Sequence, residues 1–115
     1  MKRDIDIIRK IAFALENENG FVRGVEGVSD TEFRFNGVLM IEAGLVDGVS
    51  DWGRSREPTQ APETVLLKRL TWRGYEFLSL AGENKVWEEA KATILRPGAT
   101  WAFSLFFEWL KQHAG

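Results

Sequence analysis

At 115 residues, the chain has the length of one domain that buries its own core. Five Trp and eight Phe residues indicate a packed protein rather than a disordered one. Fifteen Lys and Arg residues stand against seventeen Asp and Glu residues, so the field of the whole molecule does not attract a polyanion. The lack of cysteine excludes disulfides, thiol nucleophiles and thiolate metal sites.

The N-terminal residues do not form the apolar core of a signal peptide, because acidic residues interrupt the apolar run. The longest apolar stretch, near Trp101 to Leu110, is too short to span a bilayer. We therefore expect a cytoplasmic protein that does not bind membranes.

The first helix is predicted from about Asp4 to Glu18, where isoleucine and leucine recur at helical spacing before a polar stop ending in glycine. A short strand is predicted over Phe21 to Glu26. Ser29 and Glu32 have the spacing of a capping box, which predicts a helix from Ser29 to a glycine C-cap at Gly44.

A β-hairpin with a long tip follows this helix. Leu45 and Val46 begin its first strand, and Thr64 to Leu70 are β-branched and apolar enough to form the returning strand. The stretch from Ser50 to Glu63 contains a glycine and two prolines, which favour a loop at the tip.

Three helices are predicted after the hairpin. Thr71 caps the first of them, which breaks at Gly82 and has Tyr75, Phe77, Leu78 and Ala81 toward the core. The second runs over Glu83 to Arg96 and stops at Pro97-Gly98, and the third runs over about Ala99 to Gln112. Trp72 and Trp87 are predicted to be core residues.

This order of elements predicts an α+β fold of the winged-helix type, with a small antiparallel β-wing and extra C-terminal helices. We expect a winged-helix-like domain over residues 1–98 and a C-terminal hydrophobic helix over residues 99–115 that packs on the domain or on a partner.

Four elements occur in one order along the chain: Met1-Lys2-Arg3-Asp4-Ile5-Asp6, Leu39-Met40-Ile41-Glu42-Ala43-Gly44-Leu45, Leu70-Thr71-Trp72-Arg73-Gly74-Tyr75-Glu76-Phe77-Leu78 and Trp87. In these elements the chain resembles a family of small bacterial and prophage-associated proteins of unknown function with a winged-helix-like fold. The resemblance covers about residues 1–95 and implies a fold but no activity. Asn36 and Tyr75 stand where the family pattern has histidine, so a role of either histidine does not carry over.

A winged helix commonly places one helix in the major groove of double-stranded DNA and its wing along the backbone. Arg34 and Asn36 are residue types that read base edges, whereas acidic residues on the same helix repel phosphate. A single helix is also short for a helix-turn-helix, so the supporting helix is missing or merged. The cationic candidates for phosphate contacts are Arg54 and Arg56 at the wing tip and Lys68, Arg69 and Arg73 at its base; the alternative is a loop kept soluble by its charges.

Apolar residues give a second set of candidates, for contacts with a protein. Trp52 in the wing is either a partner anchor or a side chain folded over the hairpin. The last helix is apolar over most of its circumference, which predicts either burial within the monomer or a homodimer or docking interface. The interface candidates are Trp52, Trp101, Leu105, Phe106 and Trp109.

No cluster has catalytic or metal-ligand spacing. His113, the sole histidine, lies near the terminus, where chains fray, and the glycines form no phosphate loop. We predict a protein that is not an enzyme and uses no metal or cofactor. Two functions remain open: a DNA-binding regulator associated with a phage or mobile element, and an interaction module for a host or phage protein.

Overall fold

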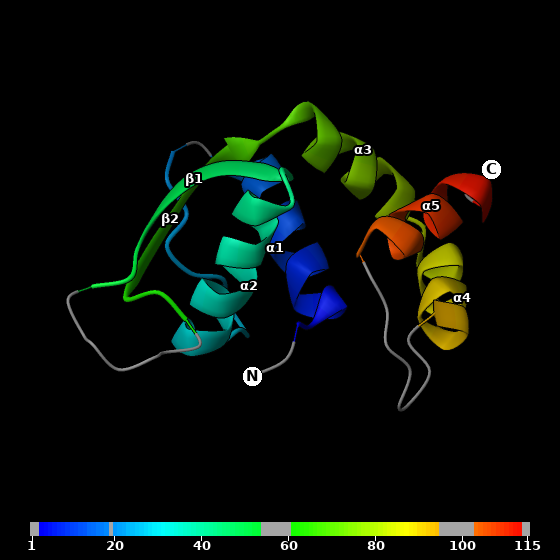
Figure 1. The fold of residues 1–115 in the computed structure, drawn as a ribbon. Helices are drawn as coiled ribbons and strands as arrows, with labels where there is room; N and C mark the ends of the chain where they lie inside the picture. The colour runs from blue at the N-terminus through cyan, green and yellow to red at the C-terminus, as the bar shows by residue number, and fades with distance from the viewer. Residues whose placement is uncertain (1–2, 19, 54–60, 95–102, 114–115) are drawn as a thin grey trace. The chain divides into compact units, whose positions relative to one another are not determined.

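The computed structural model describes residues 3–18, 20–53, 61–94 and 103–113, and its described residues form a mixed α+β structure (Figure 1). The elements in chain order are α1 (Ile5–Asn17), α2 (Asp30–Glu42), β1 (Val46–Asp51), β2 (Thr64–Leu70), α3 (Trp72–Ala81), α4 (Asn84–Ile94) and α5 (Phe103–His113). They belong to two compact units, Met1–Tyr75 and Glu76–Gly115.

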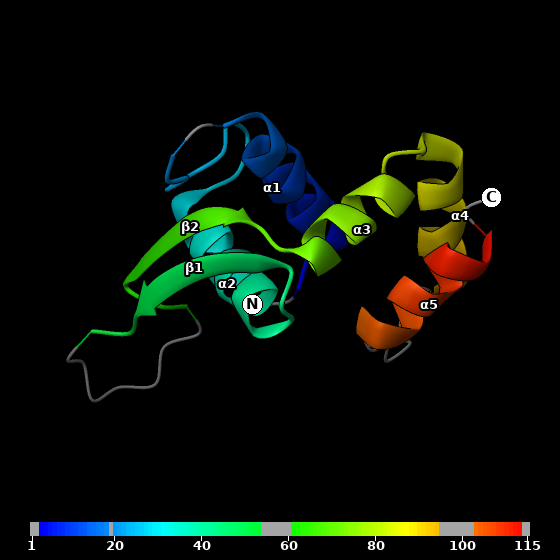
Figure 2. The same cartoon turned by 90° about the horizontal axis from the view of Figure 1, so that it is seen from above.

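In the first unit, the hairpin of β1 and β2 curves over α2, and α1 runs beside α2 (Figures 1 and 2). The apolar faces of these elements form one core, because side chains at helical spacing on α1 and α2 meet alternate side chains of the sheet. Its buried members are Ile5, Ile7, Ile8, Ile11, Ala12, Leu15, Val22, Phe33, Val38, Met40, Leu45, Val46, Val65, Leu67 and Leu70.

Both helices of this unit begin at side-chain caps. The Asp4 carboxylate accepts hydrogen bonds from the backbone N–H groups of Asp6 and Ile7 at the start of α1. At α2 the Ser29 hydroxyl accepts from the Glu32 N–H at 3.1 Å and donates to Glu32 Oε1 at 2.9 Å. The expected capping residue is confirmed, but the glutamate accepts from the serine hydroxyl, whereas a capping box uses the serine N–H.

The sheet is antiparallel and contains one β-bulge. Val46 pairs with Leu70 and Asp47 with Arg69, but Gly48 pairs with Leu67, so Lys68 is an extra residue on β2. The extra residue shifts the alternation of side chains by one. Leu70 therefore shares the buried face of β2 with Val65 and Leu67, and Lys68 and Arg69 are both exposed.

Close packing of the sheet on α2 depends on two glycines. A Cβ at Gly48 would lie 2.6 Å from the Leu66 carbonyl oxygen and 3.1 Å from the Ile41 side chain. A Cβ at Gly37 would lie 3.2 Å from Val65 Cγ1. All three distances are tighter than ordinary van der Waals contact. A larger residue at Gly48 would force β1 away from β2 and from Ile41, and one at Gly37 would push α2 away from β2.

The corner between α2, β1 and α3 explains two of the sequence motifs. Gly44 has φ +76°, the left-handed conformation that a C-terminal cap requires, and Leu45 then enters the core. The Thr71 hydroxyl donates to the Gly44 carbonyl at 2.5 Å and accepts from the Gly74 N–H at 3.1 Å. Gly74 packs so tightly against the Leu45 carbonyl that a Cβ there would overlap it.

In the second unit, α4 and α5 contact each other around a cluster of aromatic rings. Trp87 makes edge-to-face contacts with Phe77 and Phe106, at centroid distances of 6.0 and 5.3 Å. Phe107 stacks on Phe77 at 6.3 Å. These four rings are buried, so they form the core of this unit.

The structure confirms the predicted α+β class, both strands of the hairpin and the helix at Ser29. The strand predicted over Phe21 to Glu26 is wrong apart from one isolated bridge between Val22 and Leu67. Trp87 is buried as predicted, whereas Trp72 and Tyr75 are exposed, because Gly74 is the residue of this turn that faces inward. The compact units divide at Tyr75, inside α3, and the division at residue 98 stays a prediction.

Candidate binding surfaces

Asn36, a candidate for reading bases, is a buried structural residue that is 1% exposed. Its side-chain oxygen accepts from the Asp4 N–H at 2.9 Å, and its amide donates to the Glu32 carbonyl at 2.9 Å. Both ends of the amide are thus used to join the start of α1 to α2. This corrects the expectation that Asn36 faces a DNA groove, because α2 turns this position toward α1.

Arg34 is also held within the domain. Its Nε lies 3.0 Å from Asp30 Oδ2, and its Nη1 donates to the Pro62 carbonyl at 2.5 Å and to the Glu63 carbonyl at 3.4 Å. The charged neighbours on the exposed side of α2 are the acids Asp30 and Glu42. The outward surface of this helix therefore carries little unpaired positive charge for a phosphate backbone.

The described cations at the wing base lie at the end of β2 and the start of α3. Lys68 is exposed on the bulge, and Arg73 is exposed in the first turn of α3. Arg69 Nη2 pairs with Asp47 Oδ2 across the strands at 2.9 Å, in a solvent-exposed ion pair. Arg54 and Arg56, the candidates at the wing tip, lie outside the described residues.

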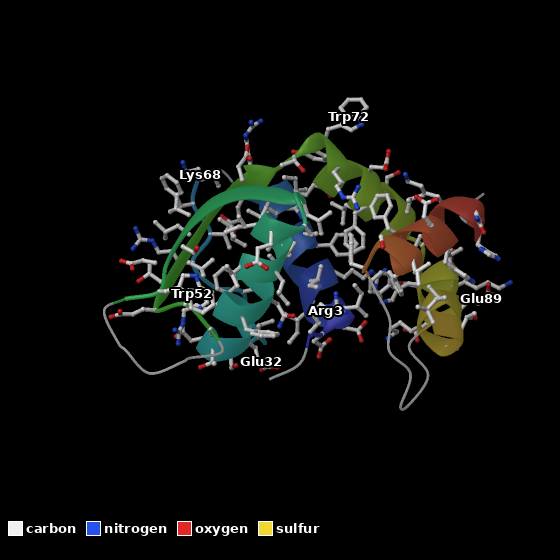
Figure 3. The ribbon with its side chains drawn as sticks, in the orientation of Figure 1. Arg3, Glu32, Trp52, Lys68, Trp72 and Glu89 are labelled. Carbon is white, nitrogen blue, oxygen red and sulfur yellow. The ribbon has the colours of Figure 1, made fainter. Side chains whose placement is uncertain are left out.

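Trp72 is the most exposed large apolar side chain that the structure describes, at 88%. It occupies the first position of α3, directly after the capping residue Thr71. In Figure 3, Trp72 points outward from the start of α3, and Lys68 points outward from β2. The exposed ring of Trp72 and the exposed cations Lys68 and Arg73 thus belong to one segment, Lys68–Arg73, here called the wing-base surface.

Trp52, the wing candidate, is 46% exposed at the end of β1. Val49, which pairs with the half-buried Leu66 on the outer face of the sheet, is 48% exposed. The outer face of the wing is therefore partly apolar. About half of the Trp52 side chain is exposed, so Trp52 is not folded fully over the hairpin.

The interface candidates on α5 divide into two groups. Phe106 is buried against Trp87, which corrects its assignment to an interface, because the aromatic cluster of this unit takes it up. Leu105 is 63% exposed, and the Trp109 ring stacks on the His113 ring at 3.9 Å. Trp101 lies outside the described residues.

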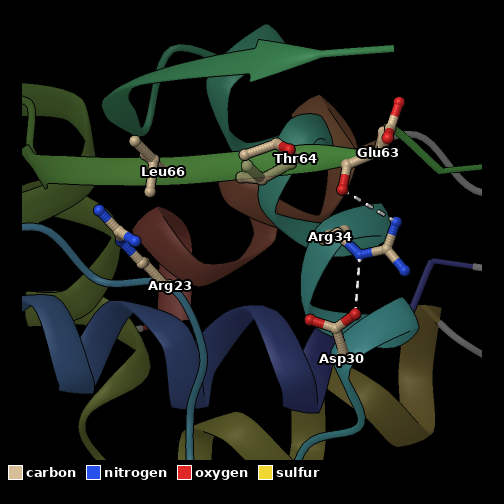
Figure 4. A pocket seen from close by; sticks show the side chains of 7 residues that line it. Arg23, Asp30, Arg34, Glu63, Thr64 and Leu66 are labelled. Carbon is tan, nitrogen blue, oxygen red and sulfur yellow. Dashed lines mark hydrogen bonds and ion pairs between the residues drawn. The ribbon is translucent and has the colours of Figure 1, made fainter. Parts of the chain in front are cut away.

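A hollow of about 410 Å³ lies beside β2 on the edge opposite β1 (Figure 4). Its lining residues are Arg23, Asp30, Arg34, Glu63, Thr64, Val65 and Leu66. In Figure 4, Arg34 bridges Asp30 and the Glu63 backbone at one end, and Arg23 lies near Leu66 at the other. This volume is within the range of about 300–1,000 Å³ that is usual for ligand sites.

The model of the family described as a hypothetical protein (DUF2513) matches residues 2–100. The chain belongs to the DUF2513 family. A relative in Haemophilus influenzae, an uncharacterized protein, is 28% identical over an alignment of 99 residues that covers 82% of this chain and 79% of the relative. No solved structure matches the chain.

The DUF2513 match covers both the wing-base surface and the hollow beside β2. The sequence predicted the cations of the wing-base surface, Lys68, Arg69 and Arg73, but not its exposed Trp72 and not the hollow beside β2. An exposed Trp has the same sequence signal as a buried one, and an open strand edge depends on where the preceding loop runs. Within the described ranges, no group of three or more His, Asp and Glu side chains could hold a metal ion, and no helix is long and apolar enough to cross a membrane.

Proposed function

We propose that this DUF2513 chain is a winged-helix-like interaction module that binds a protein partner through the wing-base surface. The observation that carries the proposal is the 88% exposure of Trp72 at the start of α3. Trp and Arg are the residues most enriched in the few positions that dominate binding energy at protein interfaces. Trp72 is followed directly by Arg73, so both residue types lie on one helical turn.

The backbone that presents Trp72 is well fixed. Thr71 bonds to Gly44 and Gly74, the Thr71 N–H donates to the Leu45 carbonyl, and Gly74 packs on that same carbonyl. A side chain on such a turn needs little ordering of the backbone when it enters a partner's pocket. Preorganisation of this kind lowers the free-energy cost of binding.

The size of Trp72 makes it a sufficient anchor. A large aromatic side chain buries about 150–250 Å², so at 88% exposure full burial in a partner would remove about 130–220 Å² from water. At about 25 cal/mol per Å², this corresponds to about 3–5 kcal/mol before the costs of association. Truncation of Trp72 should therefore weaken binding at least thirtyfold, or about 2 kcal/mol.

The winged-helix part of the proposal is supported by the connection order. α1 leads to Val22, which pairs with β2, and α2 then leads into β1 and β2. The resulting order across the sheet is Val22, β2, β1, with the hairpin as the wing. One part departs from this pattern: the described residues between Val22 and Ser29 form a turn, closed by a Val25–Val28 hydrogen bond, where a helix-turn-helix has its first helix.

The test is quantitative affinity purification from the native host with the full chain and two variants, Trp72→Ala and Val49→Ala. Val49 is a matched control, because it is another exposed apolar residue of the first unit. We expect a protein that is enriched by the unmodified chain and by Val49→Ala and is lost with Trp72→Ala. Equal recovery with all three chains would refute the assignment of Trp72.

DNA binding is the second candidate, and the observation that favours it is the exposure of both Lys68 and Arg73 at the base of the wing. If these cations contact phosphates together with Arg54 and Arg56, the affinity for any duplex should fall steeply with salt. The Arg54→Ala, Arg56→Ala double variant should bind less tightly and show a shallower salt dependence. An anisotropy titration of a labelled duplex at low salt in which the unmodified chain does not bind would exclude this candidate.

A further inference from the structure

The edge of β2 that faces away from β1 is only partly paired. Val22 occupies one position, where its N–H donates to the Leu67 carbonyl at 2.8 Å and its carbonyl accepts from the Leu67 N–H at 3.0 Å. The backbone groups of a strand point to alternate edges. Those of Val65 therefore point to the same edge as those of Leu67, whereas Leu66 pairs with Val49 of β1.

The chain leaves this edge immediately after Val22. Residues 23–28 bend away and close a turn through the hydrogen bond from the Val28 N–H to the Val25 carbonyl at 3.1 Å. Consequently, the described residues supply no backbone partner for Val65 on this edge. The hollow of about 410 Å³ borders the same stretch of strand.

The open stretch is limited at both ends. Val22 covers the edge at Leu67, and the Arg34 guanidinium covers the Glu63 carbonyl at 3.4 Å. Exposed strand edges are templates for pairing with another chain, and proteins usually shorten or cover them. Here the covering elements leave a short, narrow slot at Val65, which is 3% exposed, instead of a long, non-selective edge.

Two arginines and two acidic residues line the slot, and they differ in whether a partner engages them. Arg34 is engaged by Asp30 and by two carbonyl oxygens, and the Glu63 carboxylate lies against Gly53. Arg23 is exposed, and the described residues give it no ion pair or hydrogen bond. At the Leu66 end of the slot, the charge available to a ligand is therefore the positive charge of Arg23.

We propose that this slot binds an extended segment of a partner protein, which adds to the edge of β2 in line with Val22, pairs with the Val65 backbone and places an acidic side chain on Arg23. In such strand addition, main-chain hydrogen bonds give affinity and the flanking side-chain sites give selectivity. The slot is distinct from the wing-base surface, and the proposal holds or fails independently of Trp72.

Amide hydrogen exchange in the free protein tests whether the Val65 backbone lacks a partner on this edge. The Val65 N–H should exchange faster than the N–H groups of Leu66 and Leu67, because the latter two are paired with Val49 and Val22. Exchange of Val65 as slow as that of its neighbours would mean that the edge is already covered, and would overturn the proposal.

The binding test selects linear decapeptides from a random displayed library on the full chain and maps each selected peptide by NMR. We expect selected sequences with Asp or Glu among β-branched residues and slowed exchange of Val65 in the complex. Arg23→Ala should weaken binding about tenfold, as expected for loss of a charged hydrogen bond, and Lys85→Ala, an exposed cation of the other unit, should leave it unchanged.

Three outcomes would overturn this inference. The first is a library that yields no binder. The second is a set of peptides that shift the NMR signals of Trp72 and leave those of Val65 unchanged. The third is a set of peptides that slow the amide exchange of Gly48 and Ser50 on the opposite edge of the sheet. The second outcome would still support the proposed function, so the two failures can be told apart.

Discussion

Replacing Asn36 by Ala should destabilise the first unit strongly although the side chain is small. The substitution removes two hydrogen bonds of 2.9 Å, one from the Asp4 N–H and one to the Glu32 carbonyl. Each net bond contributes about 1 kcal/mol, and a buried donor left without a partner adds about 1–3 kcal/mol. We expect a loss of about 3–5 kcal/mol in the free energy of unfolding, since the Asn36 side chain is 1% exposed and water cannot readily take its place.

The assay is urea unfolding followed by far-UV circular dichroism, with Thr31→Ala as the control because Thr31 is exposed on the same helix. The control should change the free energy of unfolding by less than about 0.5 kcal/mol. At about 4–8 °C per kcal/mol for a unit of this size, the Asn36→Ala loss corresponds to a decrease in Tm of at least about 12 °C. If Asn36→Ala were as stable as the control, the assignment of Asn36 as the link between α1 and α2 would be refuted.

Three further predictions concern the packing of each unit and its assembly. Gly74→Ala should lower the free energy of unfolding by at least about 2 kcal/mol in thermal or urea unfolding, because a Cβ would overlap the Leu45 carbonyl. Gly24→Ala should leave it nearly unchanged, because there is open space around Gly24. Equal stabilities of the two variants would contradict the packing of Gly74. Phe107→Ala should lower the free energy of unfolding by about 3–5 kcal/mol in the same assays, because the ring lies in the buried aromatic cluster. A loss below about 1 kcal/mol would argue against that cluster. If α5 forms a homodimer, its exposed residue Leu105 lies in the interface, so Leu105→Glu should convert a sedimenting dimer to a monomer; an unmodified chain that sediments as a monomer at high concentration would exclude the dimer.

The local signals in the sequence were sufficient for most of the fold. Asp4 and Ser29 cap helices because their side chains reach backbone N–H groups within three residues, and Gly44 ends α2 because the left-handed conformation favours glycine. Such interactions involve residues close in sequence, so the helix and strand boundaries could be predicted within a few positions.

The surfaces could not be predicted in the same way, because they depend on contacts between distant residues. Asn36 is polar at a helical position, and only its contact with Asp4, 32 residues away, shows that it is buried. Trp72 is apolar, and its sequence alone does not show that it is exposed. Its side chain lies outward because Gly74, two residues later, packs inward on Leu45. The bulge at Lys68 likewise arises from pairing with β1 and has no signature in the sequence of β2 alone.

The most direct test of the proposed interaction module is photo-crosslinking at Trp72 in the native host. A benzoylphenylalanine placed at residue 72 of the full chain reacts with whatever lies against this position, and the same group at Lys10, an exposed position on α1, serves as the control. We predict a discrete adduct from residue 72 that is absent from residue 10, is sensitive to protease and resists nuclease. An adduct that nuclease removes, or the same adducts from both positions, would contradict the account.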